Sequence, residues 1–210
     1  PKQDRAYQIG ITSQKNIICY VKERGLFYFD EQQQEFIRLK NKLPNNIKKF
    51  VIDNENRLVF LTEEGKLYLY FFAFDKSKPL LSFIKIIEHP GAISTIYLTD
   101  ESFIADSKRS ITLFSNYIPQ RTINLPREKN VSQIIQQNNL LFISFIEGEC
   151  MKYNLEDGSE EKLSNLPEKI SIFTIYNSSQ DVLWIGTDGQ GILKVYKYKS
   201  PFHTIKTNYP

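Results

Sequence analysis

The sequence predicts an all-β fold that is built from a repeat of about 40 residues. Three observations support this prediction. The composition is rich in Tyr (12) and Phe (15) but contains only one Met, which is typical of pleated surfaces rather than helices. Short apolar segments recur along the chain without the i, i+3, i+4, i+7 spacing of an amphipathic helix. Glycines and polar clusters lie between these segments at the positions where hairpins need turns.

The clearest element of the repeat is a four-residue apolar strand that occurs five times. Its copies begin at Ile17, Leu58, Phe103, Leu141 and Leu183, so they are spaced by 41, 45, 38 and 42 residues. Before each copy lies another apolar segment, and a polar turn separates the two: 7–11, 47–52, 93–98, 131–135 and 170–175. Each pair therefore predicts a β-hairpin.

A second turn follows each apolar strand and leads into a third strand. It contains Gly25, Gly65, Gly148 or Gly191, whereas Lys108 and Arg109 take its place in the third repeat. That hairpin must therefore turn without glycine or through a longer loop. A weaker fourth strand, such as 35–39, completes each repeat.

Four antiparallel strands per repeat, without a helix between repeats, cannot bury both of their faces alone. Stacking the repeats radially solves this problem. We therefore predict a single domain over 1–210 that contains five four-stranded blades of a β-propeller, at about 6–40, 46–86, 92–125, 130–164 and 169–207. An open arc would expose apolar faces on its terminal blades, and we expect an incomplete propeller.

Charge and hydrophobicity exclude several classes of protein. Lys and Arg total 27 against 24 Asp and Glu, without a basic block, so we expect no nucleic-acid partner. The longest apolar run, 67–74, is too short to cross a bilayer, which predicts no membrane insertion by this region. The chain begins with Pro1 and carries no signal segment, so we expect a piece of a longer protein.

The fifth repeat reads Asp-Val-Leu-Trp-Ile-Gly-Thr-Asp-Gly-Gln-Gly-Ile over 181–192. This segment resembles the two-component regulator propeller repeat, with its Leu-Trp-Ile-Gly-Thr strand, Asp-Gly turn and glycine before the next strand. Residues 25–30 resemble the second half of the same motif. The other three repeats keep only the pattern.

The resemblance implies the periplasmic sensor region of a hybrid two-component system, of the kind that Bacteroides-type gut bacteria use to detect glycans. Such regions usually contain two seven-bladed propellers, a small β-sandwich, a membrane helix and a kinase. This chain departs from that pattern, with about five blades, no membrane helix and no kinase motif. The five blades would then be part of a larger, seven-bladed propeller.

The leading hypothesis is therefore a non-catalytic sensor domain that binds an oligosaccharide or a similar polar ligand. Its other partners would be the neighbouring propeller and β-sandwich domains, and a homodimer stays open. Any kinase activity would lie elsewhere in the full-length protein. Two alternatives remain: a propeller scaffold for protein–protein contacts, and a propeller hydrolase or lyase.

No motif predicts a catalytic residue, a metal site or a cofactor. His89 and His203 are far apart, and the turn 53–56 lacks the glycine and glutamate of a calcium loop, so we expect a solvated turn there. Trp184 invites a sugar-stacking interpretation, but its strand position matches buried residues of the other repeats, which predicts core. Cys19 and Cys150 lie in non-neighbouring repeats and are expected to be free thiols packed between sheets.

In a propeller, the turns between the second and third strands lie on one face together with the connections between blades. Planar polar and charged groups there suit the hydroxyls of sugars. The candidate ligand-binding residues in the first set of turns are Arg24, Glu64, Lys108, Arg109, Glu147, Asp188 and Gln190. The connections between blades add Asn45, Asn46, His89, Lys129, Asn130 and Glu168.

Overall fold

The computed structural model describes residues 8–75, 78–99, 103–125, 128–163, 166, 170–178 and 182–196. Within these ranges, the regular secondary structure consists of β-strands alone. No helix in this part of the chain is long and apolar enough to cross a membrane. The strands form five antiparallel sheets, and each sheet contains only strands that are consecutive in the chain. The predicted all-β architecture with repeated antiparallel sheets is confirmed.

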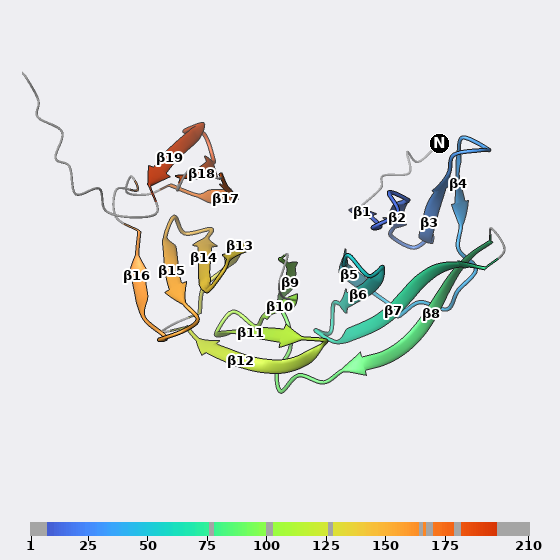
Figure 1. The fold of residues 1–210 in the computed structure, drawn as a ribbon, viewed down its shortest axis with the longest axis horizontal. Coiled ribbons are helices and arrows are strands. Elements are labelled where there is room, and N and C mark those ends of the chain that lie inside the picture. The colour runs from blue at the N-terminus through green and yellow to red at the C-terminus, as the bar shows by residue number, and fades with distance from the viewer. Residues whose placement is uncertain are drawn as a thin grey trace, which may run out of the picture. The chain divides into compact units, whose positions relative to one another are not determined.

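The chain forms two compact units, Pro1–Arg127 and Glu128–Pro210. The first unit contains three four-stranded sheets (Figure 1). Sheet I consists of β1 (Gln8–Ile11), β2 (Ile17–Val21), β3 (Gly25–Asp30) and β4 (Glu35–Arg38). Sheet II consists of β5 (Ile47–Ile52), β6 (Arg57–Thr62), β7 (Leu67–Asp75) and β8 (Lys78–Ile87). Sheet III consists of β9 (Thr95–Leu98), β10 (Phe103–Asp106), β11 (Ser110–Ser115) and β12 (Ile118–Asn124).

The second unit contains sheets IV and V. Sheet IV consists of β13 (Val131–Gln137), β14 (Leu140–Phe145), β15 (Cys150–Asn154) and β16 (Glu160–Lys162). Sheet V has three strands among the described residues: β17 (Ile172–Asn177), β18 (Val182–Thr187) and β19 (Ile192–Tyr196). The fourth strand predicted for this repeat would lie after Tyr196, outside the described residues.

Within each unit, neighbouring sheets bury apolar side chains between them. Because side chains alternate across a strand, β2 directs Ile18 and Tyr20 toward sheet II and Cys19 to the opposite face. The same alternation places Val59 against sheet III, and Phe142 against sheet V in the second unit. The first strands of neighbouring sheets also lie side by side: β1 beside β5, β5 beside β9, and β13 beside β17.

A polar clasp supports this packing at equivalent positions in both units. The side chain of Gln8 donates to the carbonyl oxygen of Lys48 at 2.7 Å and accepts from the backbone N–H of Phe50 at 2.6 Å. In the second unit, Oε1 of Gln133 accepts from the backbone N–H of Ile175 at 2.9 Å and from Oγ1 of Thr174 at 2.6 Å. Each glutamine therefore fixes the first strand of one sheet to the first strand of the next.

Three of the first strands carry the same irregularity. The pairing register shifts between Ile47 and Lys49, between Val131 and Gln133, and between Ile172 and Thr174. In each strand one extra residue lies just after the strand begins, which bends the strand and increases its twist. This shared bulge is independent evidence that sheets II, IV and V are copies of one repeat.

The expectation that Trp184 lies in the core is wrong in this structure. The repeat register is as predicted, because Trp184 occupies the β18 position that matches Val59 and Phe142, which are 0% exposed. However, Trp184 is 39% exposed. Val59 and Phe142 face a following sheet, whereas no described sheet follows sheet V in the second unit.

Candidate functional site

The first unit contains a groove of about 350 Å³ beside the turn between β2 and β3. One wall is this turn, and the other is the connection from β4 to β5. We call it the cationic groove, because three cations and one carboxylate line it. The lining residues are Tyr20, Lys22, Glu23, Arg24, Gly25, Arg38, Leu39, Asn41, Leu43, Pro44, Asn45, Asn46 and Ile47.

Local sequence explains why Arg38 reaches the groove. Arg38 ends β4 and pairs with Phe27, so its side chain runs along β3 toward Gly25. Gly25 has φ +102°, a conformation that L-residues rarely adopt. A Cβ atom there would lie 3.7 Å from Nε of Arg38 and 3.8 Å from its Nη2. A Cβ would therefore only contact the guanidinium at ordinary van der Waals distance, and the glycine is required by the positive φ of the turn rather than by space.

The cations of the groove differ in whether they already interact with another group of the protein. Within the part of the chain that the structure describes, the side chains of Lys22 and Arg38 make no hydrogen bond or ion pair. Both are exposed. Arg24, beside them on the turn, already has an interaction within the protein. Lys22 and Arg38 are therefore the groups that can bind an anion without first breaking an internal contact.

Asparagines form the opposite wall of the groove. Nδ2 of Asn41 donates to the carbonyl oxygen of Leu81 at 2.6 Å, which leaves its Oδ1 as an acceptor. Nδ2 of Asn46 donates to Oε1 of Glu64 at 3.1 Å, and its carbonyl oxygen accepts from the N–H of Glu63 at 2.8 Å. The bonds from Asn46 and Thr62 hold the pKa of the exposed Glu64 carboxyl below its usual value.

An equivalent pair occurs in the second unit. Nδ2 of Asn130 donates to Oε1 of Glu147 at 2.8 Å, and the carbonyl oxygen of Asn130 accepts from the N–H of Ile146 at 2.8 Å. In both units an asparagine just before the first strand thus contacts the turn between the second and third strands. This contact joins members of the two sets of candidate residues that the sequence supplied.

The other predicted ligand residues lie on separate turns. Lys108 and Arg109 form the exposed turn between β10 and β11, and Asp188 and Gln190 lie on the exposed turn between β18 and β19. Of the seven predicted residues, only Arg24 lines the cationic groove. Lys22, Arg38 and Asn41 were not among the residues predicted from the sequence. The signal for Arg38 was its position at the end of the fourth strand, from which its side chain reaches the turn glycine, and this becomes visible only with the pairing of β3 and β4.

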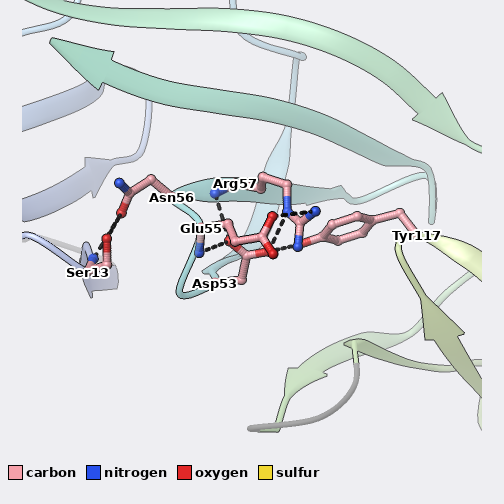
Figure 2. A network of polar contacts seen from close by, with 6 residues as sticks. All are labelled: Ser13, Asp53, Glu55, Asn56, Arg57 and Tyr117. Atoms are coloured by element: carbon pink, nitrogen blue, oxygen red, sulfur yellow. Dashed lines mark hydrogen bonds and ion pairs between the residues drawn. The ribbon is translucent and has the colours of Figure 1, made fainter.

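A second groove, of about 310 Å³, lies between sheets II and III. Figure 2 shows the polar network that forms part of its lining. Oδ2 of Asp53 accepts from Oη of Tyr117 at 2.6 Å and from Nε of Arg57 at 2.7 Å, and Nη1 of Arg57 lies 2.9 Å from Oε2 of Glu55. The Arg57 guanidinium also lies over the Tyr117 ring.

These charged groups mainly satisfy one another. Oδ1 of Asp53 accepts two further bonds, from the N–H groups of Glu55 and Arg57, and the Asp53 side chain is only 11% exposed. The expectation of a solvated turn is therefore wrong for Asp53, because Tyr117, 64 residues further along the chain, covers its carboxylate. This groove is better explained as an inter-sheet contact than as a ligand site.

The described residues contain no group of three or more His, Cys, Asp or Glu side chains that could hold a metal ion. His89 lies in a connection, where Nε2 is 3.0 Å from Oγ1 of Thr112, and His203 lies outside the described residues. Neither a scan of protein-family models nor a search of curated proteins finds a match to this chain. Its functional assignment therefore depends on its own residues.

Proposed function

We propose that this chain is the ligand-sensing part of an extracytoplasmic β-propeller region in a hybrid two-component regulator, and that its ligand is an oligosaccharide. The cationic groove carries the proposal. It lies on the turn-rich side of sheet I, where a propeller would collect its ligand-binding turns. It combines asparagine amides with Lys22 and Arg38, which have no ion pair with another described residue. Such groups bind the hydroxyl and carboxyl groups of sugars through directed hydrogen bonds.

The propeller assignment is supported by the equivalence of the sheet faces. Ile9, at the β1 position that matches Phe50 and Ile175, is 65% exposed, whereas Phe50 and Ile175 are buried against a preceding sheet. Ile9 and Trp184 thus lie on apolar faces that the repeat normally covers with another blade. In our proposal, further blades of a seven-bladed propeller cover both faces in the full-length sensor.

The motif in β18 supports the sensor assignment. Leu183 and Ile185 of the Leu-Trp-Ile-Gly-Thr segment pack between sheets IV and V, and Gly189 and Gly191 adopt positive φ in the turn that follows. The segment that resembles the regulator repeat thus occupies the second strand and the following turn of a sheet. A ligand that bridges the β2–β3 turn and the β4–β5 connection would change how sheets I and II pack, which is how a sensor could transmit binding.

The proposal is tested by measuring thermal shifts and isothermal titration calorimetry of the chain with a panel of neutral and acidic oligosaccharides. A bound oligosaccharide that is not cleaved, as judged by chromatography, is the expected result. Turnover of the oligosaccharide would indicate the hydrolase or lyase alternative instead. If no member of the panel binds at millimolar concentration, the sensor proposal is wrong.

A further inference from the structure

We infer that the ligand of the cationic groove carries a negatively charged group, a carboxylate or sulfate on a sugar ring. This inference rests on the proposed function and narrows it to acidic oligosaccharides. The charge of the lining residues supports this inference. Lys22, Arg24 and Arg38 surround the groove, with Glu23 as the only carboxylate among its lining residues.

The pairing of these cations within the protein also favours an anionic ligand. Lys22 and Arg38 make no ion pair with another described residue, although Glu23 is adjacent to Lys22 in the chain. The contrast with the groove between sheets II and III is informative, because Arg57 there is paired with both Asp53 and Glu55. Two of the cations that line the groove therefore have no carboxylate partner among the described residues, although Glu63 and Glu64 lie at its asparagine wall, and these cations can attract an anionic ligand.

The lining residues of the groove also offer no exposed aromatic ring. Neutral sugars are commonly held by stacking on an exposed aromatic ring, but the only aromatic residue that lines this groove, Tyr20, is buried. Recognition must therefore depend on charge and hydrogen bonds. The guanidinium of Arg38 has a planar fork that matches a carboxylate or sulfate, and Asn41 and Asn45 can contact the neighbouring hydroxyls.

The geometry also positions the fork. The Arg38 side chain lies beside Gly25, so its guanidinium is placed at the turn between β2 and β3, on the same groove as Lys22. Lys22 supplies a mobile point charge from the same turn. A planar guanidinium together with a flexible ammonium group suits an anion on a ring whose hydroxyls vary, because the planar fork sets the orientation of the anion and the lysine adapts.

The test uses four probes with the unmodified chain: an oligogalacturonate, its fully methyl-esterified form, a sulfated disaccharide from chondroitin sulfate, and sodium sulfate. The methyl ester keeps the hydroxyls and removes the charge. We expect one of the two acidic sugars to bind and the methyl ester to bind at least about tenfold more weakly. Binding should weaken as the salt concentration rises.

Arg38→Gln and Lys22→Gln are the test variants, and Lys15→Gln, on the exposed turn between β1 and β2, is the matched control. Circular dichroism verifies that each variant is folded. Each test variant should lose about tenfold or more in affinity for the acidic sugar, whereas the control should bind as the unmodified chain does.

The outcomes separate the two proposals. If the methyl ester binds as tightly as the acid, the charge inference is wrong and the oligosaccharide proposal stands. If the acidic sugar binds but the folded Arg38 and Lys22 variants bind it equally well, the site has been assigned to the wrong groove. If sodium sulfate binds as tightly as either sugar, the groove is a general anion site, which overturns the inference. Absence of binding by every sugar overturns the proposed function itself.

Discussion

Tyr117 and Asp53 join two sheets through a hydrogen bond of 2.6 Å between Oη of the tyrosine and Oδ2 of the aspartate (Figure 2). Tyr117 lies in the two-residue turn between β11 and β12, where both it and Asn116 have positive φ, of +60° and +49°. A bulky side chain rarely adopts this conformation. The bond to Asp53 and the contact with Arg57 offset its cost, so a strained turn of sheet III is held by sheet II.

Replacing Tyr117 with Phe removes only the hydroxyl of this contact. We expect a loss of about 1 to 3 kcal/mol in the free energy of unfolding, because a bond to a charged acceptor is lost in a nearly buried site. Urea denaturation followed by circular dichroism measures the change. Tyr176→Phe is the control, since Tyr176 is exposed and should change stability by less than about 0.5 kcal/mol. Equal losses in the two variants would contradict the role of the hydroxyl.

Lys108 fills the place of the glycine that the third repeat lacks. Its φ is +69°, and its N–H donates to Oδ1 of Asp106 at 2.8 Å. Because glycine adopts this conformation without a steric penalty, we expect Lys108→Gly to raise the free energy of unfolding by about 0.5 to 1 kcal/mol. Lys40→Gly is the matched control, because Lys40 is exposed but is not among the residues with positive φ. Urea denaturation should show the opposite sign for this control.

The side chain of Gln133 joins the first strands of sheets IV and V by accepting a hydrogen bond from the backbone N–H of Ile175. Gln133→Leu would leave the N–H of Ile175 without its acceptor in a partly buried site. We expect sheet V to lose about 1 to 3 kcal/mol of stability. Trp184, on β18, reports this loss by fluorescence during urea denaturation. Gln32→Leu, at an exposed turn, should leave the transition unchanged; a similar shift there would show that the leucine itself perturbs the fold.

The order of strands and turns could be predicted from the sequence because each repeat must bury one apolar strand and turn at short intervals. The same pattern also gave the register, since Trp184 does match Val59 and Phe142. The sequence pattern could not predict how exposed Trp184 is, because its burial depends on whether another sheet covers that face of sheet V. Nor could it place Arg38 or Asp53: the partner of Asp53 lies 64 residues away, and the position of Arg38 depends on pairing across β3 and β4.

Asp106 provides a test of pH dependence. It is 1% exposed, and burial raises the pKa of its carboxyl to about 6, although the N–H of Lys108 and the charges of Lys108 and Lys48 act in the opposite direction. In the unfolded chain the group ionises near pH 4, so the folded protein holds the proton longer. Stability should therefore fall as pH rises from about 4 to about 6, and remain constant above that range as far as this group is concerned.

Asp106→Asn removes this pH-dependent contribution to the free energy of unfolding. The asparagine keeps an oxygen that can accept the hydrogen bond from the N–H of Lys108. The difference in unfolding free energy between the variant and the unmodified chain should grow in favour of the variant between pH 4 and 6, by on the order of 3 kcal/mol. Asp53 does not interfere in this window. Burial alone would raise its pKa, but the bonds from Tyr117 and Arg57 lower it overall, so its contribution is lost only as pH falls below about 4. A difference that stays constant from pH 4 to 7 would contradict the raised pKa.

Cys19 and Cys150 are both free and buried, which confirms the absence of a disulfide between them. Their surroundings differ from expectation in one respect. Cys150 lies between sheets IV and V as predicted, whereas Cys19 faces away from sheet II, because its neighbours Ile18 and Tyr20 occupy the packed face of β2. Burial raises the pKa of both thiols, to about 12 for Cys150.

This difference predicts which of the two thiols reacts first. Thiol titration of the denatured, unreduced chain should count two thiols, and the native chain should react slowly, with Cys19 ahead of Cys150. Cys150 can react only when sheet V separates from sheet IV, so Gln133→Leu should accelerate its modification and leave the rate at Cys19 unchanged. Cys19→Ser and Cys150→Ser variants assign the two rates. If Gln133→Leu accelerates both thiols equally, the two units unfold together, and the clasp at Gln133 does not control a separate opening of sheet V.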